Sequence, residues 1–388
     1  MDLTFSDEQK FFAESVRRFA QDNLAADAVK RAHTPGYPFE VAAKLAAQGL
    51  LGITVPEADG GQGGSLMDAV IAIREIAAVC PRSADVVQSG NFGPIRTFVE
   101  YASADQKQRY LPDLLGGRAV ISLGMTEPDA GSAVTELRTS AKQDGDSYVI
   151  NGSKVFSTHS PDAKVFLVYV RFGPGTDGIG SVLVPRGTPG FAIGTPSSFM
   201  SGEEWCELHF ENCRIPAADV LLGPGGFKKQ IAGFNVERIG NATRAVSLGR
   251  YAFNLAREHA MTRHQFGRAL CEFQGLQWKF ADMAMKLDSA ELLLFRAATN
   301  VDANGLPTAY DTAVAKLACN LAGFDAANEA VQIMGGVGFS QEALAEYCLR
   351  RTRGWMIAGG SLEILRNRIA EHVFDRRFDQ RPARGGKA

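Results

Sequence analysis

The chain has 388 residues, of which 45% are hydrophobic, so it can fill more than one hydrophobic core. Its 41 Lys and Arg nearly balance its 43 Asp and Glu, and a formal charge of -2 excludes a global field that would attract nucleic acid or an anionic membrane. No secretory signal opens the sequence, no apolar stretch is long enough for a membrane helix, and the six cysteines lack zinc-site spacing. We therefore expect a folded cytoplasmic protein with no metal site.

Residues 5–115 show the periodicity of amphipathic helices. Ser6 is placed to cap the first helix, and the loop 56–65 interrupts the pattern. Residues 105–115 predict a short helix that ends at Gly116 and Gly117. The stripe of the first helix consists of Phe11, Phe12, Val16, Phe19 and Ala20. We expect a helical N-terminal domain over residues 1–118.

From residue 119 the pattern changes to the alternation of β-strands. Residues 147–156 predict two strands joined by a type I′ turn at Asn151-Gly152. Further strands are predicted at 164–171, 179–184 and 206–215. Gly173, Gly175 and Gly178 form a G-x-G-x-x-G pattern, but strands flank it on both sides, so we reject a dinucleotide site there. A central β domain is expected over residues 119–230.

Helical periodicity returns at Phe234 and continues through long amphipathic segments, which predict a bundle over residues 231–388. Residues 376–388 are rich in Arg, Gly and Pro and predict a solvated tail. The fold class is therefore α+β, with helices, a β domain and more helices in that order. The two expected apolar stripes of the bundle consist of Phe280, Met283, Leu287, Ala290 and Leu294, and of Val314, Leu317, Ala318 and Leu321.

Four motifs carry a resemblance to a known family: residues 125–132 (MTEPDAGS), Glu237-Arg238, residues 263–267 (RHQFG) and residues 332–339 (QIMGGVGF). In order and spacing they resemble the acyl-CoA dehydrogenase family over nearly the whole chain. The resemblance implies an N-terminal α-helical domain, a central β domain and a C-terminal four-helix bundle, assembled as a homotetramer (a dimer of dimers). It also implies FAD as cofactor, an acyl-CoA thioester of fatty acid metabolism as substrate and electron-transfer flavoprotein as acceptor.

The resemblance places FAD against several parts of the chain. Backbone N–H groups of residues 123–126 and the Thr126 hydroxyl can bond the polar rim of the flavin, Thr158 is similar to a ligand of flavin N5, and Phe156 stands where many members have tryptophan. Arg263 and Phe266 resemble residues that reach the FAD of a neighbouring subunit. The full expected set is Leu123, Met125, Thr126, Phe156, Thr158, Arg263, Phe266, Gln332, Gly335, Gly336, Ser361 and Glu363.

The reaction of this family needs a carboxylate that removes the α-proton. Most members carry it in a Y-E-G-T stretch, which corresponds here to residues 358–361 and holds no acid. Isovaleryl and long-chain members place it on the first C-terminal helix, and Glu237 matches that position. We predict Glu237 as the base, with a pKa raised by burial, and the N–H of Gly359 as a donor to the thioester carbonyl. The alternative is that Glu237 only complements a helix N-terminus.

The resemblance assigns Ser132 and Arg238 to CoA contacts, and either Arg96 or Arg82 is a candidate for a polar acyl end or for an ordinary surface ion pair. The absence of an acid at Gly359 is also similar to crotonobetainyl-CoA reductases, so an enoyl-CoA-type reductase stays open. A desulfinase-like enzyme without α,β-dehydrogenation is a second alternative. A non-catalytic FAD-binding protein is a third, whereas the near-zero charge argues against a nucleic-acid partner.

Overall fold

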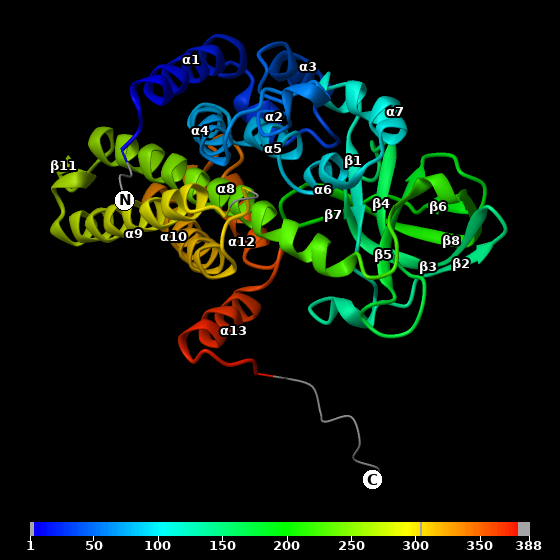
Figure 1. Ribbon diagram of the computed structural model, residues 1–388. Coiled ribbons are helices and arrows are strands. Elements are labelled where there is room, and N and C mark those ends of the chain that lie inside the picture. Colours follow the sequence, from blue (N-terminus) through cyan, green and yellow to red (C-terminus); the bar gives the residue numbers. More distant parts are fainter. Residues whose placement is uncertain (1–3, 303–304, 379–388) are drawn as a thin grey trace.

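The computed structural model describes residues 4–302 and 305–378, and it shows helices, a β-sheet and a long helical bundle in chain order (Figure 1). The α+β class predicted from periodicity is confirmed. The division into three units that end at residues 118 and 230 stays a prediction. The N-terminal helices are α1 (Asp7–Leu24), α2 (Ala28–Ala32), α3 (Phe39–Ala47), α4 (Leu66–Ala77), α5 (Pro81–Ser89), α6 (Pro94–Tyr101) and α7 (Ala104–Leu115).

Helix caps explain where the N-terminal helices begin. The Ser6 hydroxyl accepts a hydrogen bond from the N–H of Gln9, whose side chain accepts one from the N–H of Ser6, so the predicted cap of α1 is confirmed. The predicted end of α7 at Gly116 is also confirmed. The expected stripe of α1 is wrong at Phe11, which is 74% exposed, because the buried side of this helix runs through Val16, Ala20 and Leu24.

The β-sheet has the strand order β6-β8-β3-β2-β4-β5-β9, with β1 paired in parallel to β4 and β7 paired to β8. The strands predicted at 164–171, 179–184 and 206–215 are confirmed. The strand bounds are β1 (Ile121–Gly124), β2 (Ser140–Asp144), β3 (Ser147–Thr158), β4 (Val165–Arg171), β5 (Ile179–Pro185), β6 (Phe191–Ile193), β7 (Ser197–Ser198), β8 (Glu204–Pro216) and β9 (Val220–Leu222).

The hairpin predicted at Asn151-Gly152 is wrong. Strand β3 runs straight through these residues, and the turn that leads into it is at Gly145, where φ is +60°. Gly152 instead marks a register shift between β3 and β8. A Cβ atom there would lie 2.6 Å from Oγ1 of Thr139, so the missing side chain permits a close strand contact. The glycine-rich residues 173–178 connect antiparallel β4 and β5, which confirms that they open no helix.

The C-terminal part begins with α8 (Phe227–Thr262), which starts earlier than the predicted Phe234. A small hairpin of β10 (His264–Gln265) and β11 (Arg268–Ala269) follows it. The remaining helices are α9 (Gln274–Thr299), α10 (Ala309–Met334), α11 (Gly336–Phe339), α12 (Ala345–Trp355) and α13 (Leu362–Val373). Short 3₁₀ turns complete the elements at Glu57–Asp59, Val134–Glu136, Ala217–Asp219 and Leu270–Glu272. From residue 379 on, the predicted tail lies outside the described residues.

Helix α10 packs differently from the expectation. Its predicted stripe is half-buried, and the fully buried side of the helix is the adjacent one, which carries Ala315, Cys319 and Ala326 together with Lys316 and Asn320. Small residues allow α8 and α10 to cross closely, because a Cβ atom on Gly249 would lie 2.5 Å from the Cα of Gly323. On α9 the expected stripe is buried at Met283, Leu287, Ala290 and Leu294, and Phe280 packs partly buried against the core.

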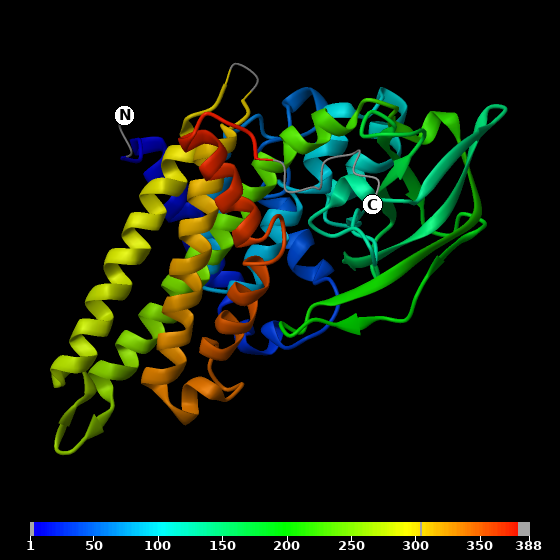
Figure 2. The ribbon, with the colours of Figure 1, turned by 90° about the horizontal axis from the view of Figure 1, so that it is seen from below.

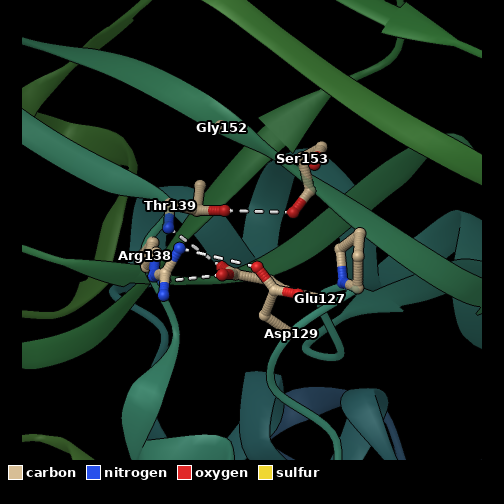
Figure 3. Close-up of a pocket in the computed structure, with 7 residues that line it drawn as sticks. Glu127, Asp129, Arg138, Thr139, Gly152 and Ser153 are labelled. Carbon is tan, nitrogen blue, oxygen red and sulfur yellow. Dashed lines mark hydrogen bonds and ion pairs between the residues drawn. The ribbon is translucent and has the colours of Figure 1, made fainter.

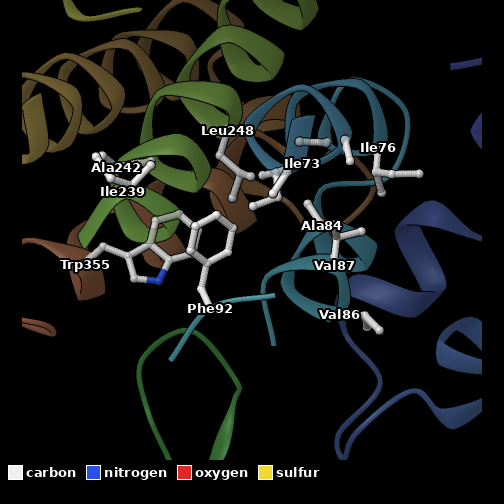
Figure 4. Close-up of a cluster of buried hydrophobic side chains, with 14 of the residues drawn as sticks. Ile73, Ile76, Ala84, Val86, Val87, Phe92, Ile239, Ala242, Leu248 and Trp355 are labelled. Atoms are coloured by element: carbon white, nitrogen blue, oxygen red, sulfur yellow. The ribbon is translucent and has the colours of Figure 1, made fainter. Parts of the chain in front are cut away.

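One hydrophobic cluster joins the N-terminal helices to the bundle (Figure 4). It combines Ile73 of α4, Phe92 after α5, Ile239 and Leu248 of α8, and Trp355 of α12. Because these buried side chains come from distant parts of the sequence, they hold α4 and the segment after α5 against α8 and α12. Among the helices of residues 4–302 and 305–378, none combines the length and apolarity that a bilayer crossing requires.

Candidate active site

Glu237 lies on α8 well beyond the first helical turn, because this helix begins at Phe227. The alternative that Glu237 complements a helix N-terminus therefore does not apply. Its Oε1 accepts hydrogen bonds from Nε2 of Gln88 and Nδ2 of Asn241, both at 3.2 Å. Its Oε2 is buried and has no hydrogen-bond partner among the described residues.

Burial raises the pKa of Glu237 to about 7, and the nearby Arg244, the Asn241 hydrogen bond, Lys316 and Arg238 only partly oppose this rise. The carboxyl group therefore changes its protonation state near neutral pH, as a general base requires. Gly93, with φ of +73°, leaves room for the group, since a Cβ atom there would lie 2.8 Å from Oε2.

The loop between α12 and α13 brings Gly359 next to this carboxylate. A Cβ atom on Gly359 would lie 2.5 Å from Nδ2 of Asn241, the same amide that holds Glu237. The carbonyl oxygen of Gly359 accepts a hydrogen bond of 3.1 Å from Nε of Arg238. Its N–H makes no hydrogen bond within the described part of the chain. The structure thus brings together the two residues that the sequence assigned to the chemistry.

Lys316 of α10 holds the backbone of this loop through hydrogen bonds. The sequence analysis did not identify this residue. Its side chain is fully buried, and Nζ donates to the carbonyl oxygens of Trp355 at 2.9 Å and Gly360 at 3.1 Å. Asn320 also donates to the Trp355 carbonyl, at 2.5 Å. Burial and the nearby Arg238 lower the pKa of Lys316 to about 7. A lysine within an alanine-rich helix face was the available signal.

A second group, centred on buried Asp85 of α5, was missed by the sequence analysis. It includes Arg82, so the surface ion pair suggested for this residue is wrong, because its partner is buried with it. This carboxylate accepts hydrogen bonds from Arg82 (3.1 Å), Arg244 (2.8 Å) and Arg351 (2.7 Å). Burial alone would raise the pKa of Asp85, but the three guanidinium groups hold it well below its usual value. Arg351 also pairs with Glu203. The group ties α5, α8 and α12 together, and it is linked to Glu237 because Arg244 also donates to Asn241.

The β domain gathers five of the residues predicted to contact FAD at the junction of β1 and β3. The Thr126 carbonyl accepts from the N–H of Val155 at 2.9 Å, and the Leu123 carbonyl accepts from the Ser157 hydroxyl at 2.9 Å. Phe156 has φ of +58° and is 54% exposed. The five predicted residues that meet here are Leu123, Met125, Thr126, Phe156 and Thr158.

A polar pocket of about 190 Å³ lies beside this junction (Figure 3). Glu127 organises it, because its carboxylate accepts from the N–H groups of Arg138 at 2.6 Å and Thr139 at 2.9 Å, and from Nζ of buried Lys154 at 2.7 Å. Burial lowers the pKa of Lys154 to about 8, against the attraction of Glu127. These bonds fix both ends of the loop that carries the exposed Ser132.

The remaining predicted FAD residues lie elsewhere. Arg263 and Phe266 are exposed at the hairpin end of the bundle, and Phe266 is 94% exposed with φ of +51° (Figure 2). Gln332, Gly335 and Gly336 are exposed where α10 returns to that end. A single chain therefore does not bring this group together with the β1–β3 junction, which lies at the other side of the molecule (Figure 1).

Three further predicted residues have structural roles or lie on the surface. The Ser361 hydroxyl caps α13 by accepting from the N–H of Ile364 at 3.4 Å, and Glu363 is exposed in the first turn of that helix. Arg96 donates from Nη1 to the carbonyl oxygen of Thr54 at 2.8 Å, which holds its guanidinium within the N-terminal helices. Among the described residues Arg96 has no ion pair with a carboxylate, so the surface ion pair suggested by the sequence is wrong, whereas a contact with a polar acyl end stays a prediction.

The fold and the sequence matches agree. Residues 6–118, 122–213 and 224–374 match the N-terminal, middle and C-terminal domains of acyl-CoA dehydrogenases. The order of helices, β domain and helices, together with the matches to this family, defines an oxidoreductase of the flavoprotein class. The chain belongs to the acyl-CoA dehydrogenase family.

Relatives in this family carry out different reactions on similar chains. The chain is 33% identical over 384 residues to the 3-sulfinopropanoyl-CoA desulfinase of Paraburkholderia xenovorans (strain LB400), covering 97% of this chain and 98% of that one. It is 34% identical to the acryloyl-CoA reductase (NADH) of Anaerotignum propionicum, covering 97% of each. The structure of butyryl-CoA dehydrogenase from Megasphaera elsdenii superposes with a TM-score of 0.89 at 29% identity, covering 96% of this chain and all (100%) of that one.

Proposed function

We propose that this protein is an FAD-dependent acyl-CoA dehydrogenase in which Glu237 removes the α-proton of an acyl-CoA thioester. The observation that supports this most strongly is the buried carboxylate of Glu237, whose pKa is raised to about 7 and whose Oε2 has no hydrogen-bond partner among residues 4–302 and 305–378. A buried acid with this pKa, close to an unpaired backbone N–H, suits proton abstraction next to a carbonyl.

In this proposal each residue of the site has a distinct role in proton abstraction. In its ionised form, Glu237 takes the proton through Oε2, because Oε1 is already occupied by two amide donors. The N–H of Gly359 donates to the thioester oxygen and stabilises the negative charge that develops there. Arg238 holds the Gly359 carbonyl, and Lys316 holds the Gly360 carbonyl, so the donor is fixed in place before substrate binds. FAD, when bound, supplies the hydride acceptor.

The donor set at the β1–β3 junction fits a flavin. Thr126 and Thr158 offer hydroxyl groups there, and the half-exposed ring of Phe156 offers an aromatic face for stacking. The ring of Trp205 lies 4.7 Å from that of Phe156 and restores an aromatic surface where the family tryptophan is absent. We assign these residues to the flavin end of FAD, and electron-transfer flavoprotein as the acceptor.

The second group of FAD residues must come from another subunit in this proposal. Arg263, Phe266, Gln332, Gly335 and Gly336 are exposed at the far end of the bundle, away from the flavin end of the described chain. A homotetramer built as a dimer of dimers would bring the two groups together. On α9, Trp278, Met285 and Leu292 are exposed at seven-residue intervals and form an apolar ridge on one side of the helix, which suits such contacts.

Further assignments follow the family. Ser132 and Arg238 are proposed to contact CoA, and Arg96 to face the acyl side of the site. Ser361 and Glu363 would lie next to FAD near the start of α13. All six cysteines are free, five of them buried, which supports a reducing, cytoplasmic setting. A place in fatty acid metabolism is proposed on the same basis.

Two alternatives have specific support. The similarity to an acryloyl-CoA reductase favours a related enzyme that works towards saturation, and Glu237 would then donate the proton that it otherwise removes. The similarity to a desulfinase favours chemistry that does not need this base. The raised pKa of Glu237 supports the dehydrogenase and the reductase over the desulfinase and over a non-catalytic FAD-binding protein.

The test is anaerobic titration of the purified protein with straight, branched, aromatic and dicarboxylic acyl-CoAs while the flavin absorbance is recorded. We expect bleaching by at least one class, and a loss of about 10²–10⁴-fold in its rate in Glu237→Gln. Glu258→Gln, an exposed position on the same helix, serves as the control. Bleaching that persists in Glu237→Gln would exclude Glu237 as base. Oxidation of the reduced flavin by enoyl-CoAs, without bleaching by acyl-CoAs, would favour the reductase.

A further inference from the structure

We propose that Gln88 and Asn241 form an amide clamp that positions Glu237, occupying Oε1 so that Oε2 alone exchanges the proton. This inference deepens the proposed function and rests on it for the identity of the base. The clamp consists of two amide NH₂ groups from different helices, α5 and α8, that reach the same carboxylate oxygen at 3.2 Å. In this role Gln88 and Asn241 are positioning residues.

The first step of the argument is the unequal state of the two carboxylate oxygens. Oε1 has two donors, whereas Oε2 is buried without a partner among the described residues and faces Gly93, which has no side chain. A proton binds most readily to the oxygen that is not already stabilised by donors. The clamp therefore determines which oxygen acts, and it prevents rotation of the carboxyl group that would exchange the two.

The second step is that two donors to Oδ1 of Asn241 fix the orientation of its amide. Its Oδ1 accepts from Nη2 of Arg244 at 3.2 Å and from Nε2 of Gln88 at 3.3 Å, so its NH₂ group must face Glu237. Arg244 is itself held by Asp85 at 2.8 Å, and its guanidinium lies 4.3 Å from the centre of the Trp355 ring. A flipped amide would direct NH₂ against a guanidinium.

The third step concerns the charged groups around the carboxylate. Arg244 and Arg238 face it from α8 and Lys316 faces it from α10, while Asp85 of α5 reaches it only through Arg244. Burial raises the pKa of Glu237 and the Asn241 hydrogen bond lowers it. Because the amides donate to the ionised form, they keep the group available as a base near neutral pH. Loss of either donor should move its titration upward.

The test measures the titration of Glu237 directly. Isotope-edited infrared spectroscopy of the holoenzyme without acyl-CoA follows the protonated carboxyl band, which is assigned by its absence in Glu237→Gln. We expect Asn241→Leu and Gln88→Leu each to raise the midpoint by about one pH unit, the size of one hydrogen bond to a charged group. Ser247→Ala, on the same helix, removes a buried hydroxyl that has no hydrogen-bond partner in the described part of the chain, and it should leave the midpoint unchanged.

A second variant keeps the test decisive if Asn241→Leu does not fold. Asn241→Asp has the same shape, keeps the acceptor for Arg244 and loses the donor to Glu237, so it should raise the midpoint by more than Asn241→Leu does. The pH profile of flavin reduction should shift in parallel in every variant. An unchanged midpoint in folded Asn241→Asp and Gln88→Leu would overturn the clamp. If Glu237→Gln still reduces flavin, the proposed base is wrong, but the infrared midpoints still decide on the clamp.

Discussion

A side chain at Gly359 and the amide of Asn241 would compete for the same space: a Cβ atom on residue 359 would lie 2.5 Å from Nδ2 of Asn241. The position that the family resemblance assigns to the base of most members is thus crowded here by the amide that holds Glu237, the proposed base. Glycine also suits the local backbone, since φ at this residue is +71°. The same amide therefore disfavours a side chain at residue 359 and holds the carboxylate of residue 237.

Gly359→Ala should therefore destabilise the protein and disturb the base at the same time. We expect a loss of about 2–3 kcal/mol from the positive φ angle and the overlap with Asn241. The rate of flavin reduction should fall by about 10–100-fold, because displacement of the Asn241 amide also displaces the Glu237 carboxylate that is hydrogen-bonded to it. Denaturant unfolding and single-turnover flavin reduction measure the two effects. Gly354→Ala is the matched control, since a Cβ atom there in α12 would meet nothing within 4 Å. Equal stability in both variants would contradict the overlap.

Because the pKa of Glu237 is raised, we expect Glu237→Gln to make the folded protein more stable even though it removes the proposed base. The folded pKa is raised from 4.5 to about 7, so the folded state binds the proton more tightly than the unfolded state. Stability is then lost as pH rises from about 4.5 to about 7, and the total is roughly 3 kcal/mol at most. Glu237→Gln removes the buried charge while it keeps the acceptor for Gln88 and Asn241.

Thermal unfolding of the wild type and Glu237→Gln should therefore agree at pH 4.5 and separate above pH 7, with the variant more stable. The wild-type rate of flavin reduction should rise with pH through a midpoint near 7, because only the ionised carboxylate accepts a proton. A variant that is less stable than the wild type at pH 8 would show that Glu237 is not charged and buried there.

Asp85→Asn should be far more damaging than a typical surface change. The variant leaves Arg82, Arg244 and Arg351 with one carboxylate fewer in a buried site, which we expect to cost about 3–5 kcal/mol. The pKa of Asp85 is depressed, so its contribution is present above the unfolded pKa and is lost only as pH falls well below it. Denaturant unfolding at neutral pH measures the loss.

Asp325→Asn is the control for Asp85→Asn. Asp325 pairs with Lys286 at 2.9 Å between two partly exposed side chains, and the change should alter stability by no more than about 0.5 kcal/mol. Similar losses in the two variants would contradict a special role for the buried group.

Local patterns predicted much of the fold. The cap at Ser6, the end of α7 at Gly116 and the strands β4, β5 and β8 each depend on neighbouring residues, and they were predicted correctly. The hairpin at Asn151-Gly152 was wrong because pairing with β8 and a close contact with Thr139 outweigh the preference of the dipeptide for a turn. The buried face of α10 was misplaced because Lys316 is satisfied by carbonyl groups far away in the sequence.

The site was predictable only in part, for the same reason. Glu237 and Gly359 could be singled out by motif position, and the structure places them on either side of one amide. Gln88, Asp85 and Lys316 belong to no motif, and their importance depends on contacts between α5, α8 and α10 that no local pattern encodes. Long-range pairing, rather than residue type, gives these polar side chains their roles.

The apolar ridge of α9 gives a test of the assembly. We expect Met285→Lys, at the centre of the ridge formed with Trp278 and Leu292, to reduce the assembled mass measured by light scattering, because a charge would be buried between subunits. FAD content should fall in parallel, since Arg263 and Phe266 of a neighbour are proposed to hold the cofactor. Phe11→Lys, at a residue of α1 that is 74% exposed, should change neither quantity. A Met285→Lys protein with wild-type mass and lower FAD content would place the ridge outside the subunit contact, and a protein with lower mass and full FAD content would remove the need for a neighbour.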